Sequence, residues 1–477
     1  MTQKRTSFSG GFGFVLAAAG SAVGLGNIWR FPYLAAKDGG GIFLLVYLIL
    51  ALTFGFTLLT AEVAIGRKTQ QGPLTAYNKL KSGKMQKLLG ILACVVPFII
   101  LPYYCDIGGW VLKYFVAFVT GHGTEAAEDG YFGGFITSEV EPIVYMVIFL
   151  VIIAAIIFIG VNKGIELSSR ILMPILLVMI IGVAIFSLFI SHTDESGVTT
   201  TGLDGLKALF IPDFEGMTFQ KFIQVVVDAM GQLFFSLSIA MGIMIAYGSY
   251  VNKEANLVKS INEIEIFDTA VAFLAGTMII PAVYVFQGAE GMKASGPSLM
   301  FVSLPKVFAE MGTIGNVVGA VFFAMVLFAA ITSAMSILEA VVSSLIDRFQ
   351  LSRKVATIQE SIMACILAVI VCLGYNILYV EIRLPNMSEE QNGQVLDIMD
   401  YISNSVLMPI VAILTCVLIG WIVKPKTIID ECQANGEKLG RRGLFSIMIR
   451  YVAPVFLFLL FLQSSGIFRL LGIEYFG

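Results

Sequence analysis

The stretch Gly20-Ser21-Ala22-Val23-Gly24-Leu25-Gly26-Asn27 lies inside the first apolar segment of the chain, residues 12–36, and Arg30 and Pro32 follow it closely. Helix packing alone would account for a pair of small residues such as Gly20 and Gly24. Three glycines, an amide and an arginine together leave a helix weak and polar. Unwound backbone at membrane depth is tolerated only where it lines a cavity or binds a ligand. The stretch therefore predicts a membrane helix that is broken near its middle.

The composition of the whole chain agrees with a membrane protein. Of its 477 residues, 57% are hydrophobic and only 13% are charged, which exceeds what the core of a soluble domain requires. A span of the hydrocarbon core takes ~20 apolar residues in a helix, and we find about eleven such segments. The fold class that follows is an all-α membrane protein in contact with the lipid bilayer.

Several other classes of protein are disfavoured by the same sequence. The net charge is −3 and the basic residues lie in short loops, which is atypical of a nucleic-acid partner. Five of the six cysteines fall in apolar segments, so we expect no disulfide framework. His122 and His192 lack the spacing of a zinc site, and no catalytic Ser/His/Asp or paired-aspartyl arrangement indicates an enzyme.

The loop charges predict the orientation of the spans. Loops on one side are basic, from Lys4 and Arg5 through to the loop of residues 424–442, whereas those on the other side carry mainly acids. Basic loops face the cytoplasm. We therefore expect a multi-pass protein of the plasma membrane that retains its first span, with the N-terminus in the cytoplasm and the C-terminus outside.

A second interruption occurs in the sixth apolar segment, residues 219–251, at Ser236-Leu237-Ser238 and Gly242. Serines in a membrane helix commonly bond back to their own turn, so this signal is weak alone. Two helices broken at the same depth, however, present helix N-termini to a carboxylate and free carbonyls to a hard cation. The pair of breaks predicts a site for an amino acid and Na⁺. The mildly apolar loop of residues 288–315 predicts a re-entrant or capping element.

Three further stretches belong with these interruptions, namely Tyr103-Tyr104, residues 329–333 and residues 396–400. Together they resemble the neurotransmitter:sodium symporter family, and most closely its bacterial amino-acid branch. The resemblance runs in order over about ten spans. It implies the leucine-transporter fold, in which two inverted repeats of five helices contain broken helices 1 and 6. We expect the repeats at residues 1–190 and 219–424, and an eleventh helix at residues 443–471.

The resemblance also implies two Na⁺ sites. The first would consist of Ala22, Asn27, Ser236 and Asp268, completed by the carboxylate of the substrate. The second would consist of Gly20, Val23, Ala329, Thr332 and Ser333. Every proposed ligand is an oxygen atom, which suits a hard cation.

The implied substrate is a hydrophobic L-amino acid, with aromatic side chains as one alternative. Tyr104 would meet its carboxylate, Phe235 would close over it, and the adaptable Met241 would face its side chain. Because Asp268 supplies a built-in negative charge, the resemblance implies transport independent of chloride; a position near the membrane interface is the alternative for this acid. The residues expected to line the pocket are Ser21, Ala22, Gly24, Leu25, Gly26, Ile100, Tyr104, Phe235, Ser236, Ser238, Met241, Ser333 and Ile337.

Two charge pairs match the gates of the family. Arg30 and Asp400 would close the outer side, and Arg5 and Asp347 would close the inner side with the help of Phe8 and Tyr250. Anchoring at the membrane interface is the alternative role for the inner pair. Gly164 and Pro174 match a spacing at which bacterial relatives unwind the fifth helix, and a simple proline kink is the alternative there.

Two rival functions remain open at this point. The first is a carrier of biogenic amines, but its relatives place an aspartate at position 24, where this chain has glycine. The second is a ligand-gated channel or receptor, which would not require two midplane breaks. The favoured interpretation is a symporter that couples amino-acid import to the Na⁺ gradient by alternating access.

Overall fold

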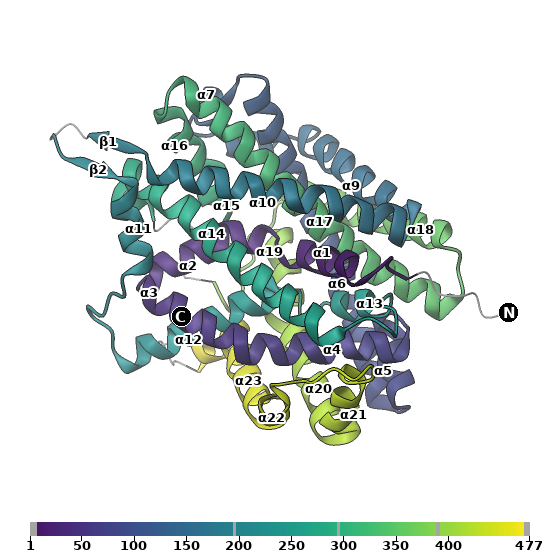
Figure 1. Ribbon diagram of the computed structural model, residues 1–477. Helices are drawn as coiled ribbons and strands as arrows, with labels where there is room; N and C mark the ends of the chain where they lie inside the picture. The colour runs from purple at the N-terminus through teal and green to yellow at the C-terminus, as the bar shows by residue number, and fades with distance from the viewer. Residues whose placement is uncertain (1–6, 194–196, 293–295, 388–391, 472–477) are drawn as a thin grey trace.

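The computed structural model describes residues 7–193, 197–292, 296–387 and 392–471. Within these ranges the chain is almost entirely helical (Figure 1). The one sheet found there is a short antiparallel hairpin in which β1 (Ser191–Thr193) pairs with β2 (Thr199–Thr201). The all-helical class predicted from the sequence is confirmed.

The first part of the chain contains ten α-helices and three π-helical segments, labelled η, which are α1 (Gly11–Ala22), η1 (Gly26–Arg30), α2 (Phe31–Lys37), α3 (Gly41–Leu50), η2 (Ala51–Gly55), α4 (Phe56–Thr69), α5 (Pro73–Leu80), α6 (Lys84–Val119), α7 (Gly123–Ala126), α8 (Tyr131–Ile136), α9 (Glu141–Ile159), η3 (Val161–Glu166) and α10 (Leu167–Leu188). Segment η3 runs directly into α10. The fifth span therefore begins six residues earlier than the apolar run, at Val161 rather than Leu167.

The second part contains α11 (Gly202–Phe210), α12 (Phe219–Ser236), α13 (Ile243–Gly248), α14 (Leu257–Gly291), α15 (Gly296–Ser298), η4 (Leu299–Ser303), α16 (Leu304–Glu310), α17 (Thr313–Phe349), α18 (Arg353–Leu373), α19 (Val395–Asp400), η5 (Tyr401–Leu407), α20 (Met408–Val417), η6 (Leu418–Val423), α21 (Pro425–Cys432), α22 (Arg442–Ile447), η7 (Met448–Val452), α23 (Ala453–Ser464) and α24 (Ile467–Leu470). Helix α14 is kinked at Gly288, where the backbone is not helical.

The count of spans agrees with the sequence. Nine helices in the described residues are long and apolar enough to cross a membrane. A tenth span is the pair of residues 11–22 and 26–37, which bends by 53° at its break. The sixth predicted span is divided into α12 and α13, so both predicted breaks are present. The division into inverted repeats at residues 1–190, 219–424 and 443–471 stays a prediction.

The break in the sixth span is fixed by unusual backbone conformations. Ser238 (φ 52°), Ala240 (φ 63°) and Gly242 (φ 70°) all lie in the left-handed region. Such a conformation costs a residue other than glycine about 1–3 kcal/mol and persists only where the surroundings impose it. At Gly242 a Cβ atom would lie 2.7 Å from the carbonyl oxygen of Ala93, so glycine is required there for space as well as conformation.

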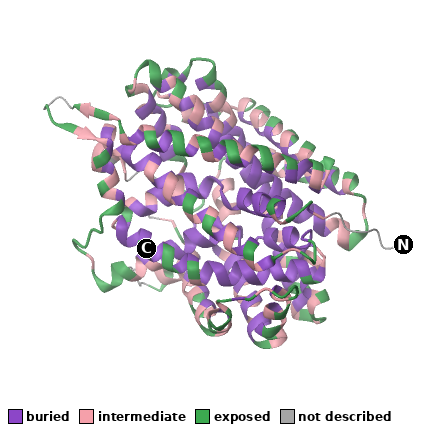
Figure 2. Cartoon of the chain, viewed as in Figure 1, coloured by how far each residue is buried: buried purple, intermediate pink, exposed green. Residues whose placement is uncertain are grey.

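The two broken helices lie at the centre of the molecule. Residues of α1 and α13 are buried almost throughout, whereas the outer helices carry exposed residues along one side (Figure 2). The longest helix, α17, packs along α6 beside them. Apolar side chains on the outer surface, such as Val178 and Val151, are more than half exposed and are suited to contact lipid.

Residues 296–310, inside the predicted capping element of residues 288–315, are helical. Its segment η4 buries Leu299, Met300 and Phe301. The hydroxyl of Tyr114 on α6 donates a hydrogen bond of 2.8 Å to the carbonyl oxygen of Phe301, and the two rings lie 5.1 Å apart. The segment is therefore packed against the helices and is not a solvated linker.

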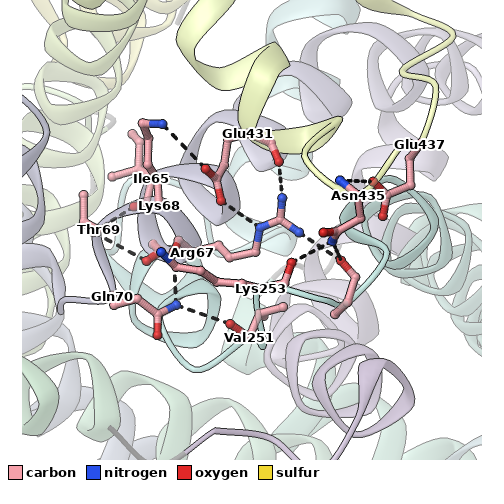
Figure 3. Close-up of polar contacts among 12 residues, drawn as sticks. Ile65, Arg67, Lys68, Thr69, Gln70, Val251, Lys253, Glu431, Asn435 and Glu437 are labelled. Atoms are coloured by element: carbon pink, nitrogen blue, oxygen red, sulfur yellow. Dashed lines mark hydrogen bonds and ion pairs between the residues drawn. The ribbon is translucent and has the colours of Figure 1, made fainter. Parts of the chain in front are cut away.

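A cluster around Arg67 joins three distant parts of the chain at the end that the sequence places in the cytoplasm (Figure 3). Arg67, at the end of α4, is fully buried and donates to a carboxylate oxygen of Glu431 at 2.9 Å and to the carbonyl of Ala255 at 2.9 Å. Asn435 donates to the carbonyl of Lys253 at 2.6 Å. These bonds fasten the α20–α23 connection to α4 and to the loop before α14.

Replacing Arg67 with Ala is expected to destabilise the protein by about 3 kcal/mol, because it leaves Glu431 without its buried partner. Thermal unfolding in detergent measures this effect. Lys68→Ala serves as the control, since Lys68 contacts the same carboxylate at 3.6 Å from a partly exposed position and should contribute less than about 1 kcal/mol. Equal unfolding temperatures for the two variants would contradict the assignment.

Candidate functional site

A small cavity of about 20 Å³, room for about one water molecule, lies where the two broken helices meet. Asn27 and Ile243 form part of its wall. The rest of the wall consists of all the residues that were predicted to line the pocket, namely Ser21, Ala22, Gly24, Leu25, Gly26, Ile100, Tyr104, Phe235, Ser236, Ser238, Met241, Ser333 and Ile337. The structure therefore brings together residues of α1, α6, α12, α17 and the two breaks.

The glycines of the first break allow these elements to approach closely. A Cβ atom on Gly24 would lie 2.7 Å from the hydroxyl oxygen of Ser333, and one on Gly26 would lie 2.8 Å from the ring of Phe235. The hydroxyl of Tyr104 lies 3.4 Å from the same position on Gly24 and, among the described residues, has no hydrogen-bond partner although it is buried. An unpaired buried hydroxyl is costly unless a ligand pairs with it.

A buried carboxylate lies beside the cavity. Asp268 on α14 is fully buried, and its Oδ1 accepts hydrogen bonds from Asn27 Nδ2 at 2.9 Å and Ser236 Oγ at 2.6 Å. Its Oδ2 accepts a hydrogen bond of 3.3 Å from the hydroxyl of Tyr47, a residue that the sequence analysis did not include. The amide oxygen of Asn27 is buried without a partner in the part of the chain that the structure describes. A carboxylate with an unpaired amide oxygen nearby is a suitable donor set for a hard cation.

The residues of the second predicted cation site also lie together. The hydroxyl of Ser333 donates to the carbonyl of Ser21 at 3.2 Å, and a Cβ atom on Gly20 would lie 3.3 Å from Cβ of Thr332. Val23 and Ala329 are fully buried in the same region. The oxygens available there are carbonyls and hydroxyls, which are ligands that Na⁺ accepts. Met173, which the sequence analysis missed, borders this region, with its sulfur 3.1 Å from the same position on Gly20.

A much larger cavity of about 1100 Å³ lies on the opposite side of Tyr104 and Phe235. Arg30 and Asp400, the predicted outer pair, both line it. No ion pair joins these two residues, since the side chain of Asp400 instead accepts a hydrogen bond of 2.5 Å from Asn404. The structure therefore brings the two residues of the predicted outer pair to one cavity without an ion pair between them.

The opposite end of the broken helices is tightly packed. Phe8 is buried, its backbone N–H donates to the carbonyl of Tyr250 at 3.0 Å, and the two rings meet edge to face at 6.2 Å. Asp347 accepts a hydrogen bond of 2.5 Å from the backbone N–H of Gly72. Arg5, the predicted partner of Asp347, lies outside the described residues.

An ion pair next to Tyr250 was not predicted. Arg353 donates to Glu339 at 2.6 Å, and the hydroxyl of Tyr250 donates to the same carboxylate at 2.5 Å. Glu339 is fully buried on α17. An acid in the middle of an apolar segment is itself a signal of function or of a partner, so the sequence contained a cue to this pair.

Glu62 on α4 is a second acid that the sequence analysis missed. It is buried, and its Oε1 accepts a hydrogen bond of 2.7 Å from the backbone N–H of Ala240 inside the break of the sixth span. Glu62 therefore satisfies a backbone group that the break leaves without a helical partner. Its position in an apolar run between residues 41 and 66 was the available signal.

These features define a class of protein. A chain that crosses the membrane many times, with two broken helices around one polar cavity and a buried acid beside it, has the architecture of a secondary membrane transporter. The model of the Sodium:neurotransmitter symporter family matches residues 5–124 and 136–476. The chain belongs to this family and is a multi-pass membrane protein.

Individual relatives cover nearly the whole chain. It is 31% identical over 471 residues to the uncharacterized sodium-dependent transporter YhdH of Bacillus subtilis (strain 168), covering 98% of this chain and 99% of that protein. It is 32% identical to the uncharacterized sodium-dependent transporter MJ1319 of Methanocaldococcus jannaschii, covering 97% and 91%. The crystal structure of MhsT in complex with L-phenylalanine matches with a TM-score of 0.82 and 35% identity, over 97% of this chain and 100% of MhsT.

The bond from Ala240 to Glu62 yields a prediction about stability. Glu62→Leu should destabilise the protein by about 1–3 kcal/mol, because the buried N–H of Ala240 loses its acceptor. Glu62→Gln keeps an acceptor oxygen and should retain most of the stability. Thermal unfolding of the two variants in the same detergent is the measurement. A Gln variant as unstable as the Leu variant would show that the hydrogen bond is not the stabilising interaction.

Proposed function

We propose that this protein is a symporter that imports hydrophobic L-amino acids together with Na⁺ across the plasma membrane by alternating access, without a requirement for chloride. The observation that carries the proposal is the buried carboxylate of Asp268, held by Asn27 and Ser236 beside the cavity between the two broken helices. We further propose that the N-terminus lies in the cytoplasm and the C-terminus outside.

The first Na⁺ would bind between Asp268, the amide oxygen of Asn27, the hydroxyl of Ser236 and the carbonyl of Ala22. The unpaired amide oxygen of Asn27 supports this, because a cation would satisfy it. The carboxylate of the substrate would complete the ligands. Binding of substrate and of this ion would then depend on each other, which is the physical requirement for symport.

The second Na⁺ would bind where α17 packs on the first break, among Gly20, Val23, Ala329, Thr332 and Ser333. The close approach of Gly20 to Thr332 supports this assignment. The ion would fasten α17 to α1, so its release would loosen the packing between them. The side-chain ligands proposed for both sites are oxygen atoms, which suit Na⁺. They belong to Asn27 and Ser236 at the first site and to Thr332 and Ser333 at the second.

The substrate would lie in the cavity with its carboxylate near Tyr104 and its side chain toward Met241. The unpaired hydroxyl of Tyr104 supports the first contact. Gly24 leaves this region without a fixed acid, which favours a substrate that carries its own carboxylate over an amine. MhsT, a structural relative solved with L-phenylalanine, supports a hydrophobic substrate. Because the cavity holds only about 20 Å³ here, the side chains of Phe235 and Met241 would have to move to admit an amino acid.

The gates would act in turn. Closure of the outer side would bring Arg30 to Asp400 across the large cavity that both residues line. Opening of the inner side would separate Phe8 from Tyr250, with Arg5 and Asp347 as the implied ion pair. The contacts of Phe8 described above support a closed inner side in this structure.

Uptake by proteoliposomes of purified protein tests the proposal and its ion requirement. Labelled hydrophobic L-amino acids should accumulate when Na⁺ is outside and fail to accumulate when K⁺ replaces it, because the proposed cages suit the smaller ion. Replacing chloride with gluconate should leave uptake unchanged. Asp268→Asn removes the internal negative charge and should weaken Na⁺ binding or make it respond to chloride.

Undiminished uptake in K⁺ would overturn the symport assignment. Complete dependence of the unmodified protein on chloride, or tight binding of a decarboxylated amine, would overturn the roles given to Asp268 and Gly24. Amino-acid amides and esters serve as controls, because they keep the side chain and lose the carboxylate.

Met241 is expected to set the preference among side chains. Met241→Ala enlarges the pocket and Met241→Phe fills it, and a single methylene in an apolar pocket changes affinity by about 1–3 kcal/mol. The order of preference among Leu, Met, Phe, Tyr and Trp should therefore change between the two variants while transport is retained. Competition against one labelled substrate gives the order. An identical order in both variants would place Met241 outside the pocket.

A further inference from the structure

Arg30 in this structure lies against helix α12. A Cβ atom on Gly231 would lie 3.4 Å from a guanidinium nitrogen of Arg30, so the absence of a side chain at Gly231 leaves room for the arginine. Asp228 is three residues earlier on the same helix, about one turn away. Asp228 and Asp400 both line the large cavity together with Arg30. The large cavity therefore presents two carboxyl groups to Arg30, one from α12 and one from α19.

Each of the two acids has a local partner as well. Asp400 is held by the amide of Asn404 at 2.5 Å. Asp228 accepts hydrogen bonds from Lys37 Nζ and from Gln224 Nε2, both at 3.1 Å. When Arg30 moves from one carboxylate to the other, neither carboxylate is left unpaired. The exchange therefore costs little free energy.

Asp38 adds a second carboxyl group next to Asp228. It follows Lys37, beyond the end of the first span, and is 2% exposed. Its Oδ2 has no hydrogen-bond partner within the described residues. Burial, and then the neighbouring charge of Asp228, raise the pKa of Asp38 to about 7. The charged groups around it are Lys37 on its own helix, Asp228 and Lys221 on α12, and Asp213, whose backbone N–H donates to the carbonyl of Gly39.

We propose that Asp228 is a second partner of Arg30, which holds the outer gate open in competition with Asp400, and that Asp38 adjusts this competition in response to external protons. When Asp38 is ionised, it adds negative charge beside Asp228 and strengthens the hold on Arg30. When Asp38 is protonated, it donates to Asp228 and weakens that hold, so Arg30 moves to Asp400 and closure is favoured. Asp228 and Asp38 are positioning residues here, because neither touches the substrate.

The proposal rests on the proposed transport function, but its test does not require transport. Gln463 lines the large cavity, so the rate at which a membrane-impermeant thiol reagent labels Gln463→Cys reports how open that cavity is. The same protein without this substitution gives the background, since its six free cysteines are buried or partly buried. If Na⁺-driven uptake failed while the variants still changed the labelling rate as described below, the proposed transport function would be overturned and the gate proposal would stand.

In the Gln463→Cys protein, adding Asp228→Asn should slow labelling by about fivefold, because Arg30 loses its partner on α12. Asp400→Asn should speed labelling, and the double variant should label as fast as Asp400→Asn alone. Well above pH 7, where Asp38 stays ionised, Lys37→Met should also speed labelling, because it frees Asp228 for Arg30, and this opposite sign separates the proposal from simple misfolding. Glu215→Gln changes an exposed acid in the segment before α12; it is the control and should have no effect.

Labelling should rise with pH through about 7, and Asp38→Asn should abolish this rise. A merely structural role for Asp38 would alter stability without removing the pH dependence. Unchanged labelling in Asp228→Asn, or slowing that persists in the Asp228/Asp400 double variant, would overturn the competition. A pH profile in Asp38→Asn that matches the unmodified protein would overturn the role of Asp38.

Discussion

Backbone groups exposed by two helix breaks inside the membrane are the constraint on which the rest of the structure depends. Each unpaired N–H or C=O group at that depth costs several kcal/mol, since no bulk water can pair with it. Side chains from other helices provide the missing partners. Gln232 donates to the carbonyl of Gly26 at 3.1 Å, Ser238 and Ser333 donate to the carbonyl of Ser21, and Glu62 accepts from Ala240. The helices that carry these residues must therefore meet at the breaks.

The same assignment of hydrogen-bond partners shows which polar groups are left for a ligand to bind. Among the described residues, the hydroxyl of Tyr104 and the amide oxygen of Asn27 at the cavity, and the amide oxygen of Gln232 near the first break, are buried without partners. Asp268, by contrast, accepts from Asn27, Ser236 and Tyr47. Three neutral donors stabilise a carboxylate but do not neutralise it. A cation beside Asp268 and a carboxylate beside Tyr104 would complete this arrangement, and this is the physical content of coupling between ion and substrate.

The sequence predicts the breaks well, because glycine and polar residues inside an apolar run weaken the helix and are costly in contact with lipid. It also predicts which residues line the cavity once the family is recognised. It does not predict the partners that reach the breaks from far along the chain, such as Glu62, which bonds a residue 178 positions away, or Tyr47, 221 positions from Asp268. Periodicity describes neighbours along one helix, and these contacts depend on how separate helices pack. The packing of Arg30 against Gly231 of α12 also escapes the sequence, for the same reason.

The two sides of the cavity differ in how they are closed. Leu25, Tyr104 and Phe235 line both the small cavity and the large one, so side chains alone separate them on that side. Side-chain rotation is fast and leaves the backbone in place. Toward the other end, Phe8 bonds Tyr250 through the backbone, and Tyr250 in turn bonds the ion pair of Glu339 and Arg353. For solvent to reach the cavity from that side, the segment of Phe8 would have to separate from the segment of Tyr250. The buried ion pair of Glu339 and Arg353 would then become exposed. The slow step of a transport cycle is therefore expected at the end where the helices are fastened by backbone and charge.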